Sequence, residues 1–225
     1  MAKRIILGAA SVLLVIAAAY AAFYVAPEER TMGLIQRIFY FHAATAWAGF
    51  TAFLVCFIGN LLYVWKREPK YDWLGVSSAE VGLACITIVL ITGPIWAHPV
   101  WGIWWTWDAR LTSTFVLWLL YVSYLLLRTL IEEPERRALL SAVFGIFAFL
   151  DVPLVYGSIR WWRTQHPSPV IMGGQGSGLD PTMKKVFFFS VLAMHILVAF
   201  LIVERYALEK LKSEVDILRR EAEAQ

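Results

Sequence analysis

Six long apolar stretches constrain the fold of this 225-residue chain more than any other feature. A helix that crosses a membrane needs roughly 20 mostly apolar residues. The stretches that reach this length are Ile5–Tyr24, Ala43–Trp65, Leu74–Ala97, Ser113–Leu130, Ala138–Tyr156 and Val186–Tyr206. Composition agrees, because 60% of the residues are hydrophobic and 16% are charged, against about 45–50% and 25% in soluble domains. We therefore expect an all-α, polytopic membrane protein with six transmembrane helices.

Lysine and arginine are distributed unevenly between the two sides of this predicted bundle. Thirteen of the 20 fall on the side of the two termini, in loops or at helix ends, and seven fall on the other side. Because positive residues are enriched in cytoplasmic loops, we expect both termini to be cytoplasmic. We also expect residues 1–206 to form the six-helix domain and residues 207–225 a cytoplasmic helical tail. The net charge of +3 is spread along the chain, which does not indicate a nucleic acid partner.

The outer side carries a dense aromatic run, Trp-Gly-Ile-Trp-Trp-Thr-Trp-Asp-Ala-Arg-Leu-Thr, at residues 101–112. Its indoles are Trp101, Trp104, Trp105 and Trp107. Indole is flat and apolar, and its N–H needs a hydrogen-bond partner. Three interpretations are open: an aromatic belt at the membrane interface, a docking patch for another protein, and a platform for a planar ligand. Belt tryptophans are usually scattered along helix ends, so this density favours the ligand platform.

An acid and a base follow the tryptophans. Charged groups at or within a membrane are usually paired or functional. Arg110 can donate a two-pronged hydrogen bond to a ligand carboxylate. Asp108 can hold a backbone turn or accept a hydrogen bond from an indole. The alternative is that Asp108 and Arg110 only pair with each other.

Two histidines are predicted on the same outer side as the tryptophans. His42 lies at the start of the second span, and His166 follows Trp161-Trp162-Arg163. Haem iron takes axial imidazoles from opposite faces, its macrocycle needs apolar walls, and its propionates need cations. We therefore predict a haem site with His42 and His166 as axial ligands to the iron. Arg110 is the favoured propionate partner, followed by Arg37 and Arg163.

The other histidines and the two cysteines carry weaker signals. His98 is a competing ligand on the outer side, although we expect a loop or surface role for it. His195 lies inside the sixth span, where a hydrogen-bonded core histidine is expected. Cys56 and Cys85 also fall inside predicted spans, which is typical of small core residues. The sequence has no Cys-x-x-Cys-His motif, so covalent attachment of haem to this chain is not expected.

These segments together resemble a known family. The run from Trp101 to Thr112 is similar to the tryptophan-rich signature of a haem-handling superfamily. Within it, the chain resembles the CcmC family of haem-transfer proteins in cytochrome c maturation. Residues 36–42, Gln-Arg-Ile-Phe-Tyr-Phe-His, resemble the segment with the first outer histidine of that family. Residues 151–156 and 161–167 resemble the segment with the second. The larger haem exporter-ligases share the tryptophan motif, but they have a second histidine pair inside the membrane, where this chain has His195 alone.

One departure from the family pattern concerns the backbone at the first histidine. Ala43 and Ala44 stand where the family often has Val-Pro, so a helix can continue through His42. A second departure is His98, which stands where the family more usually has a Gly-Arg or Gly-Lys sequence. That change removes one candidate cation for a propionate and adds one candidate ligand.

The resemblance implies a function without catalysis. It implies that the protein binds haem b at the outer, periplasmic face of the bacterial inner membrane and delivers it to a periplasmic haem chaperone. It also implies other partners: the ABC transporter subunits of the same system, a small single-span accessory subunit and membrane lipid. Two alternatives stay open at this point. A transmembrane haem permease subunit would have a polar path through its spans, and a structural assembly subunit without a ligand would purify colourless.

Overall fold

The computed structural model describes residues 2–162, 164, 166 and 178–223. Within these ranges the chain forms seven α-helices and no β-strand. The helices are α1 Ala2–Tyr20, α2 Ile38–Lys66, α3 Pro69–Trp101, α4 Ala109–Leu130, α5 Pro134–Phe149, α6 Asp151–Trp161 and α7 Pro181–Glu223. A short π-helical turn, η1 (Ala21–Val25), extends α1, and a 3-10 turn, η2 (Leu34–Arg37), leads into α2.

Six segments of this structure are long and apolar enough to cross a membrane. They are Arg4–Val25, Leu34–Lys66, Pro69–Trp101, Ala109–Leu130, Pro134–Trp161 and Pro181–Glu223. The predicted fold class, an all-α membrane protein with six spans, is confirmed. The orientation of the termini stays a prediction from charge.

The fifth span is broken in the structure. Helix α5 ends at Phe149, and α6 begins at Asp151. Proline has no N–H, so Pro153 cannot donate the helical hydrogen bond to the carbonyl of Phe149, and its ring crowds that carbonyl. The break places α6 on α4, close to the start of that helix.

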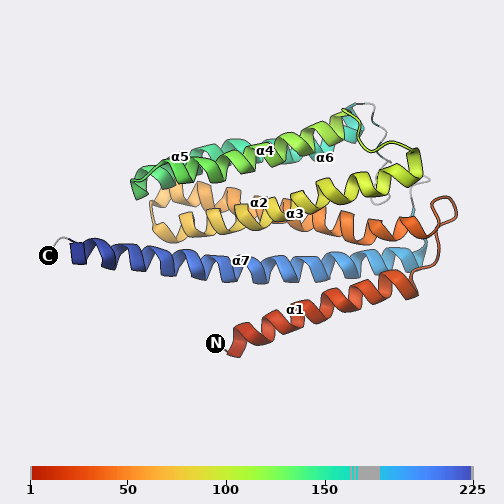
Figure 1. Cartoon of the computed structure of the whole chain (residues 1–225), viewed down its shortest axis with the longest axis horizontal. Coiled ribbons are helices and arrows are strands. Elements are labelled where there is room, and N and C mark those ends of the chain that lie inside the picture. Colours follow the sequence, from red (N-terminus) through yellow and green to blue (C-terminus); the bar gives the residue numbers. More distant parts are fainter. Residues whose placement is uncertain (1, 163, 165, 167–177, 224–225) are drawn as a thin grey trace.

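Helices α2 and α3 form the centre of the bundle and pack extensively against each other. Helices α4, α5 and α6 cover one side of this pair, while α7 and α1 cover the other (Figure 1). Both termini lie at one end of the bundle (Figure 1). The connections 26–33 and 102–108 lie at the opposite end, so the tryptophan run is far from the termini.

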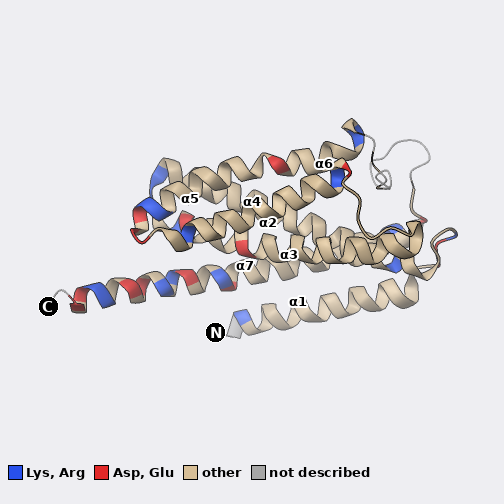
Figure 2. Cartoon of the chain, turned by 45° about the horizontal axis from the view of Figure 1, so that its top comes forward, with Lys and Arg blue, Asp and Glu red and all other residues tan. Residues whose placement is uncertain are grey.

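Charged residues gather mainly at the two ends of the bundle and along the end of α7 that projects beyond it (Figure 2). Helix α7 has 43 residues, about twice the length needed to cross a membrane. Residues 207–223 continue this helix without a break. The division into a membrane domain and a cytoplasmic tail at residue 206 stays a prediction.

The interior between the two ends of the bundle is tightly filled. The rings of Phe53 and Tyr121 stack at 3.5 Å between centroids. Asn60 is completely buried beside Gly75, where a Cβ atom would lie 2.6 Å from the Asn60 Oδ1 atom. A further hollow, lined by Asp72 and Arg128 among others, opens at the end of the bundle nearest the termini.

Candidate functional site

The tryptophan run folds as a short connection with a cap at each end. Gly102 ends α3 with φ of 73°, and its N–H donates to the carbonyl of His98 at 2.8 Å. Glycine favours this left-handed conformation because it has no Cβ. The carboxylate of Asp108 begins α4 by accepting from the N–H groups of Arg110 and Leu111, at 2.9 and 3.0 Å. The indoles between the caps are therefore held on five residues between two rigid helices.

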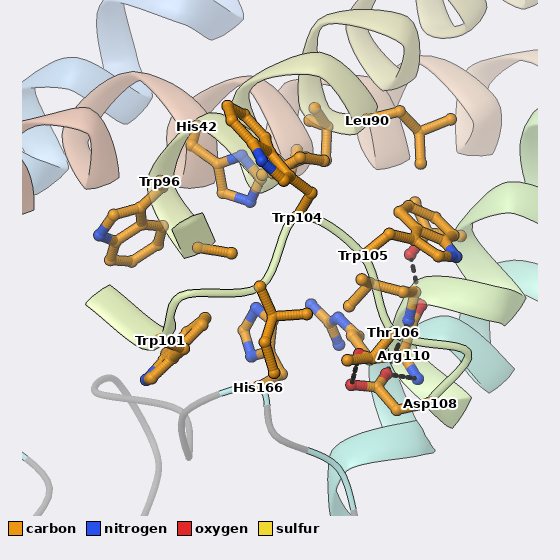
Figure 3. A pocket seen from close by; sticks show the side chains of 18 of the residues that line it. His42, Leu90, Trp96, Trp101, Trp104, Trp105, Thr106, Asp108, Arg110 and His166 are labelled. Carbon is orange, nitrogen blue, oxygen red and sulfur yellow. Dashed lines mark hydrogen bonds between the residues drawn. The ribbon is translucent and has the colours of Figure 1, made fainter. Parts of the chain in front are cut away.

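This connection forms one wall of an open hollow of about 870 Å³ at the end of the bundle opposite the termini. The predicted site residues that line it are His42, His166, Trp101, Trp104, Trp105, Asp108 and Arg110. They come from α2, from the connection after α3, from the start of α4 and from the segment after α6. Figure 3 shows the two imidazoles on opposite sides of the hollow.

A second hollow adjoins the first on the side of α7. It is lined by the loop after η1, by α2, by Tyr156 and Ile159 of α6, and by the start of α7. The two hollows share His42, His166, Arg110, Trp96, Ala46 and Phe50. The imidazoles therefore stand where the hollows meet, with space on both sides for the edges of a flat ligand.

His42 is held by a residue that the sequence analysis missed. Helix α2 runs through His42 without interruption, as Ala43 and Ala44 allow. The Nδ1 atom of His42 lies 2.8 Å from the hydroxyl oxygen of Thr92 on α3. Trp96, one turn further along α3, packs edge-on against the imidazole at 5.8 Å between ring centroids. No sequence motif links Thr92 to His42, because the contact depends on how α2 and α3 pack.

Arg110 is a partly buried cation without a carboxylate partner in the described part of the chain. Its guanidinium donates to the backbone carbonyl of Val155 on α6, at 2.7 Å. No ion pair joins its side chain to Asp108 or to another described acid. The simple Asp108–Arg110 side-chain pair, which the sequence left open, is therefore absent. The remaining donors of Arg110 can bind an anion in the hollow.

The Asp108 carboxylate is occupied by its own neighbours. Besides the two backbone N–H groups of α4, it accepts from the Thr106 hydroxyl at 3.2 Å. Burial raises the pKa of the Asp108 carboxyl, but hydrogen bonds from Leu111, Thr164, Thr106 and Arg110 outweigh burial and hold the pKa below its usual value. Asp108 is thus an ionised helix cap that shapes the hollow.

Two indole N–H groups at the hollow have no hydrogen-bond partner among the described residues. They belong to Trp96 and Trp105, both of which line it. Buried donors are normally paired, so unpaired donors beside a hollow suit a ligand that supplies acceptors. Apolar walls, two imidazoles, Arg110 and these donors fit haem, which combines a flat macrocycle, an iron atom and two carboxylates.

Two of the predicted site residues that the structure describes, Trp107 and Arg37, do not line the hollow. Trp107 is 73% exposed and packs edge-on against Trp105 at 5.5 Å. Arg37 ends η2 and lines neither hollow, whereas Arg30 lines the second. Arg163 lies outside the described residues. Arg30 was missed because nothing in its local sequence distinguishes it from other loop arginines.

The remaining histidines do not line the hollow. His98 is exposed and stacks on Trp104, with ring centroids 4.2 Å apart, and it does not line the pocket. The ring nitrogens of His195 lie within hydrogen-bond distance of the Thr51 hydroxyl and the Val191 carbonyl, at 3.0 and 2.8 Å. Both placements agree with the expected surface and core roles.

The sequence of this chain is similar to those of known proteins. The family model described as Heme exporter protein C, CcmC, matches residues 1–223. The chain belongs to the CcmC family. A Heme exporter protein C of Bradyrhizobium diazoefficiens is 33% identical over 95% of this chain and 78% of its own length. The Escherichia coli K12 protein of the same name is 32% identical over 81% of this chain and 74% of its own.

Relatives of this CcmC-family chain also come from plants. A putative cytochrome c biosynthesis ccmC-like mitochondrial protein of Arabidopsis thaliana is 32% identical over 66% of this chain and 56% of its own length. The first two matches cover most of both chains, so the likeness extends well beyond the tryptophan run.

Proposed function

We propose that this CcmC-family protein binds haem b at the outer, periplasmic face of the inner membrane and delivers it to a periplasmic haem chaperone. A role in haem handling for cytochrome c maturation follows from the family. The family is one of transport or transfer proteins rather than catalysts. The protein itself makes and breaks no covalent bond in this proposal.

One observation carries the proposal. His42 and His166, more than 120 residues apart in the sequence, line one hollow from opposite sides together with Arg110 (Figure 3). Two imidazoles can supply the axial ligands of haem iron. Arg110 can hold a propionate, and the indoles of Trp101, Trp104 and Trp105 can cover the macrocycle.

The position of the hollow favours transfer over permeation. It is open at one end of the bundle, which leaves part of a bound haem accessible to a protein partner. Towards the termini, the stacked rings of Phe53 and Tyr121 and the buried Asn60 fill the described core. A permease would need a polar path through this region. The imidazoles and the unpaired donors also argue against a structural subunit without a ligand.

The proposed partners follow from the family. They are the periplasmic haem chaperone, the ABC transporter subunits of the cytochrome c maturation system, a small single-span accessory subunit and membrane lipid. The protein is a multi-pass membrane protein, and we assign it to the bacterial inner membrane. In this proposal, the ABC transporter supplies the energy for release of the loaded chaperone.

The experiment compares the wild type with the double variant His42→Ala/His166→Ala, each in nanodiscs and offered haem b. We expect a Soret band in the wild type and its loss in the double variant, because both axial ligands are gone. On addition of a soluble chaperone domain, the wild-type band should pass to the soluble fraction.

His98→Ala is the matched control, because His98 is on the same side of the membrane but does not line the hollow. We expect its spectrum to be nearly that of the wild type. Undiminished haem in the double variant would contradict the ligand assignment. Haem that stays in the membrane fraction would contradict delivery.

A further inference from the structure

We infer that Thr92 is a positioning residue for His42: its hydroxyl fixes the imidazole tautomer, so that the Nε2 atom faces the iron as a strong ligand. The inference rests on the proposed function, because it takes His42 as an axial ligand of haem. It adds a residue outside the tryptophan run and the two histidine segments. Thr92 itself does not touch the haem in this proposal.

The hydrogen bonds of Thr92 decide which nitrogen of His42 carries the proton. A threonine hydroxyl has one proton to donate and lone pairs to accept with. The Thr92 hydroxyl lies 2.8 Å from the carbonyl oxygen of Ile88, one turn earlier in α3, and a carbonyl can only accept. Its proton is used there, so the Thr92 oxygen is the acceptor in its contact with His42 at 2.8 Å. The Nδ1 atom must then donate, and Nε2 keeps its lone pair.

The orientation of the ring is fixed by the same stretch of α3. A Cβ atom at Gly93 would lie 3.4 Å from the Cε1 atom of His42, so the helix backbone approaches the ring closely. Trp96 packs edge-on against the imidazole, with an interplanar angle of 64°. Thr92, Gly93 and Trp96 therefore contact the ring from one wall, and the hollow lies on the side left open.

This arrangement affects the metal as well as the protein. A histidine that donates from Nδ1 to an oxygen is locked in one tautomer, and its other nitrogen becomes more basic. A more basic ligand binds iron more tightly and stabilises the ferric state over the ferrous state. Removing such a partner typically costs about 10–100-fold in metal affinity.

The experiment uses three single variants of the full chain in nanodiscs. Thr92→Val keeps the shape of the side chain but removes the acceptor, and Thr92→Ser restores a hydroxyl. Thr87→Val is the matched control. Thr87 also lies on α3, donates to the carbonyl of Leu83 at 2.8 Å and accepts from the Trp118 indole at 2.9 Å, but it faces α4 rather than His42. The readouts are the haem b affinity, the reduction potential and the electron paramagnetic resonance spectrum of the ferric haem.

We expect Thr92→Val to lower the haem affinity about ten-fold and to raise the reduction potential, with a changed ferric spectrum. Thr92→Ser should return all three readouts towards the wild type, and Thr87→Val should leave them unchanged. A wild-type potential and affinity in Thr92→Val would overturn the inference. Equal shifts in Thr87→Val, or no recovery in Thr92→Ser, would also overturn it, because the cause would then be general packing of α3.

His42→Ala separates this inference from the proposed function on which it rests. If His42→Ala binds haem like the wild type, the ligand assignment fails. If haem binding depends on His42 but not on Thr92, only the role of Thr92 fails. In the double variant His42→Ala/Thr92→Val we expect no loss beyond that of His42→Ala alone. A further loss would place the effect of Thr92 elsewhere. Circular dichroism measures the folded fraction of each variant. If Thr92→Val does not fold, Thr92→Ala is used in its place.

Discussion

Helix α4 carries one partly buried arginine near each end, and the two have different partners. Arg128 donates both prongs of its guanidinium to the carboxylate of Asp72 on α3, at 2.6 and 2.9 Å. Arg110 donates to a backbone carbonyl on α6 and makes no ion pair with a described acid. The same residue type on one helix therefore joins two helices through an ion pair at one end and leaves donors for a ligand at the other.

The surroundings of the two arginines also differ, because side chains pack closely near Arg128 and a hollow lies beside Arg110. Near Arg128, Asn60 is fully buried, and a Cβ atom at Gly145 would clash with its amide nitrogen. Near Arg110, the hollow contains the two imidazoles and the exposed faces of the indoles. The ion pair between Arg128 and Asp72 is structural, because it joins two helices. The position of Arg110 beside a hollow indicates a site for an anion.

The largest expected effect comes from breaking the ion pair between Arg128 and Asp72. Arg128→Met leaves the Asp72 carboxylate buried without its partner, which should lower the free energy of unfolding by about 3–5 kcal/mol. The measurement is denaturant unfolding in mixed detergent micelles. The double variant Arg128→Met/Asp72→Leu removes both charges and should recover most of the loss. Wild-type stability in Arg128→Met would show that the pair is not structural.

The second expected effect is a loss of haem affinity when Arg110 is replaced. Arg110→Met should weaken haem b binding about 10–100-fold, since a hydrogen bond to a charged group contributes about 1.5–3 kcal/mol. It should not lower the stability of the haem-free protein as Arg128→Met does, because no described acid loses its partner. Spectroscopic haem titration gives the affinity.

Arg110→Lys sharpens this test, because it keeps the charge and loses the two-pronged geometry. We expect an affinity between those of the wild type and Arg110→Met. If Arg110→Met binds haem normally but unfolds as easily as Arg128→Met, the two arginines have the same structural role and the comparison fails.

The sequence predicts much of this fold, because the length and polarity of a membrane span are local properties. The six spans, the tryptophan connection and the shared side of His42 and His166 could all be predicted in this way. Hydrogen bonds between side chains and groups on different helices could not be predicted from the sequence. The carbonyl that holds Arg110, and the hydroxyl that holds His42, depend on how α4 meets α6 and how α2 meets α3.

The sequence was also ambiguous at residue types that can have two structural roles, such as proline within a helix and aspartate before one. Pro94 leaves α3 helical to Trp101, whereas Pro153 coincides with the break between α5 and α6. Asp108 was weighed as a partner of Arg110 or as a residue that holds a turn, and only the geometry shows that it caps α4. Arg30, on the second hollow, has no motif around it that would have distinguished it.

The smallest expected effect tests that cap. Asp108→Ala should lower the free energy of unfolding of the haem-free protein by about 1 kcal/mol at neutral pH, because two N–H groups of α4 lose their acceptor. Asp108→Asn is the control, since asparagine caps helices about as well as aspartate but carries no charge. A loss in Asp108→Asn equal to that in Asp108→Ala would contradict the role as a cap.

The charge of Asp108 adds a pH dependence with a defined sign. The pKa of the folded carboxyl is below its usual value, and an unfolded aspartate titrates near about 3.9. Its extra stabilisation is therefore fully present above the unfolded pKa and is lost as the pH falls through the folded pKa. The stability difference between wild type and Asp108→Ala should be constant from neutral pH to about pH 5 and should shrink at lower pH. A difference that grows as the pH falls would mean that burial, rather than hydrogen bonding, controls this carboxyl.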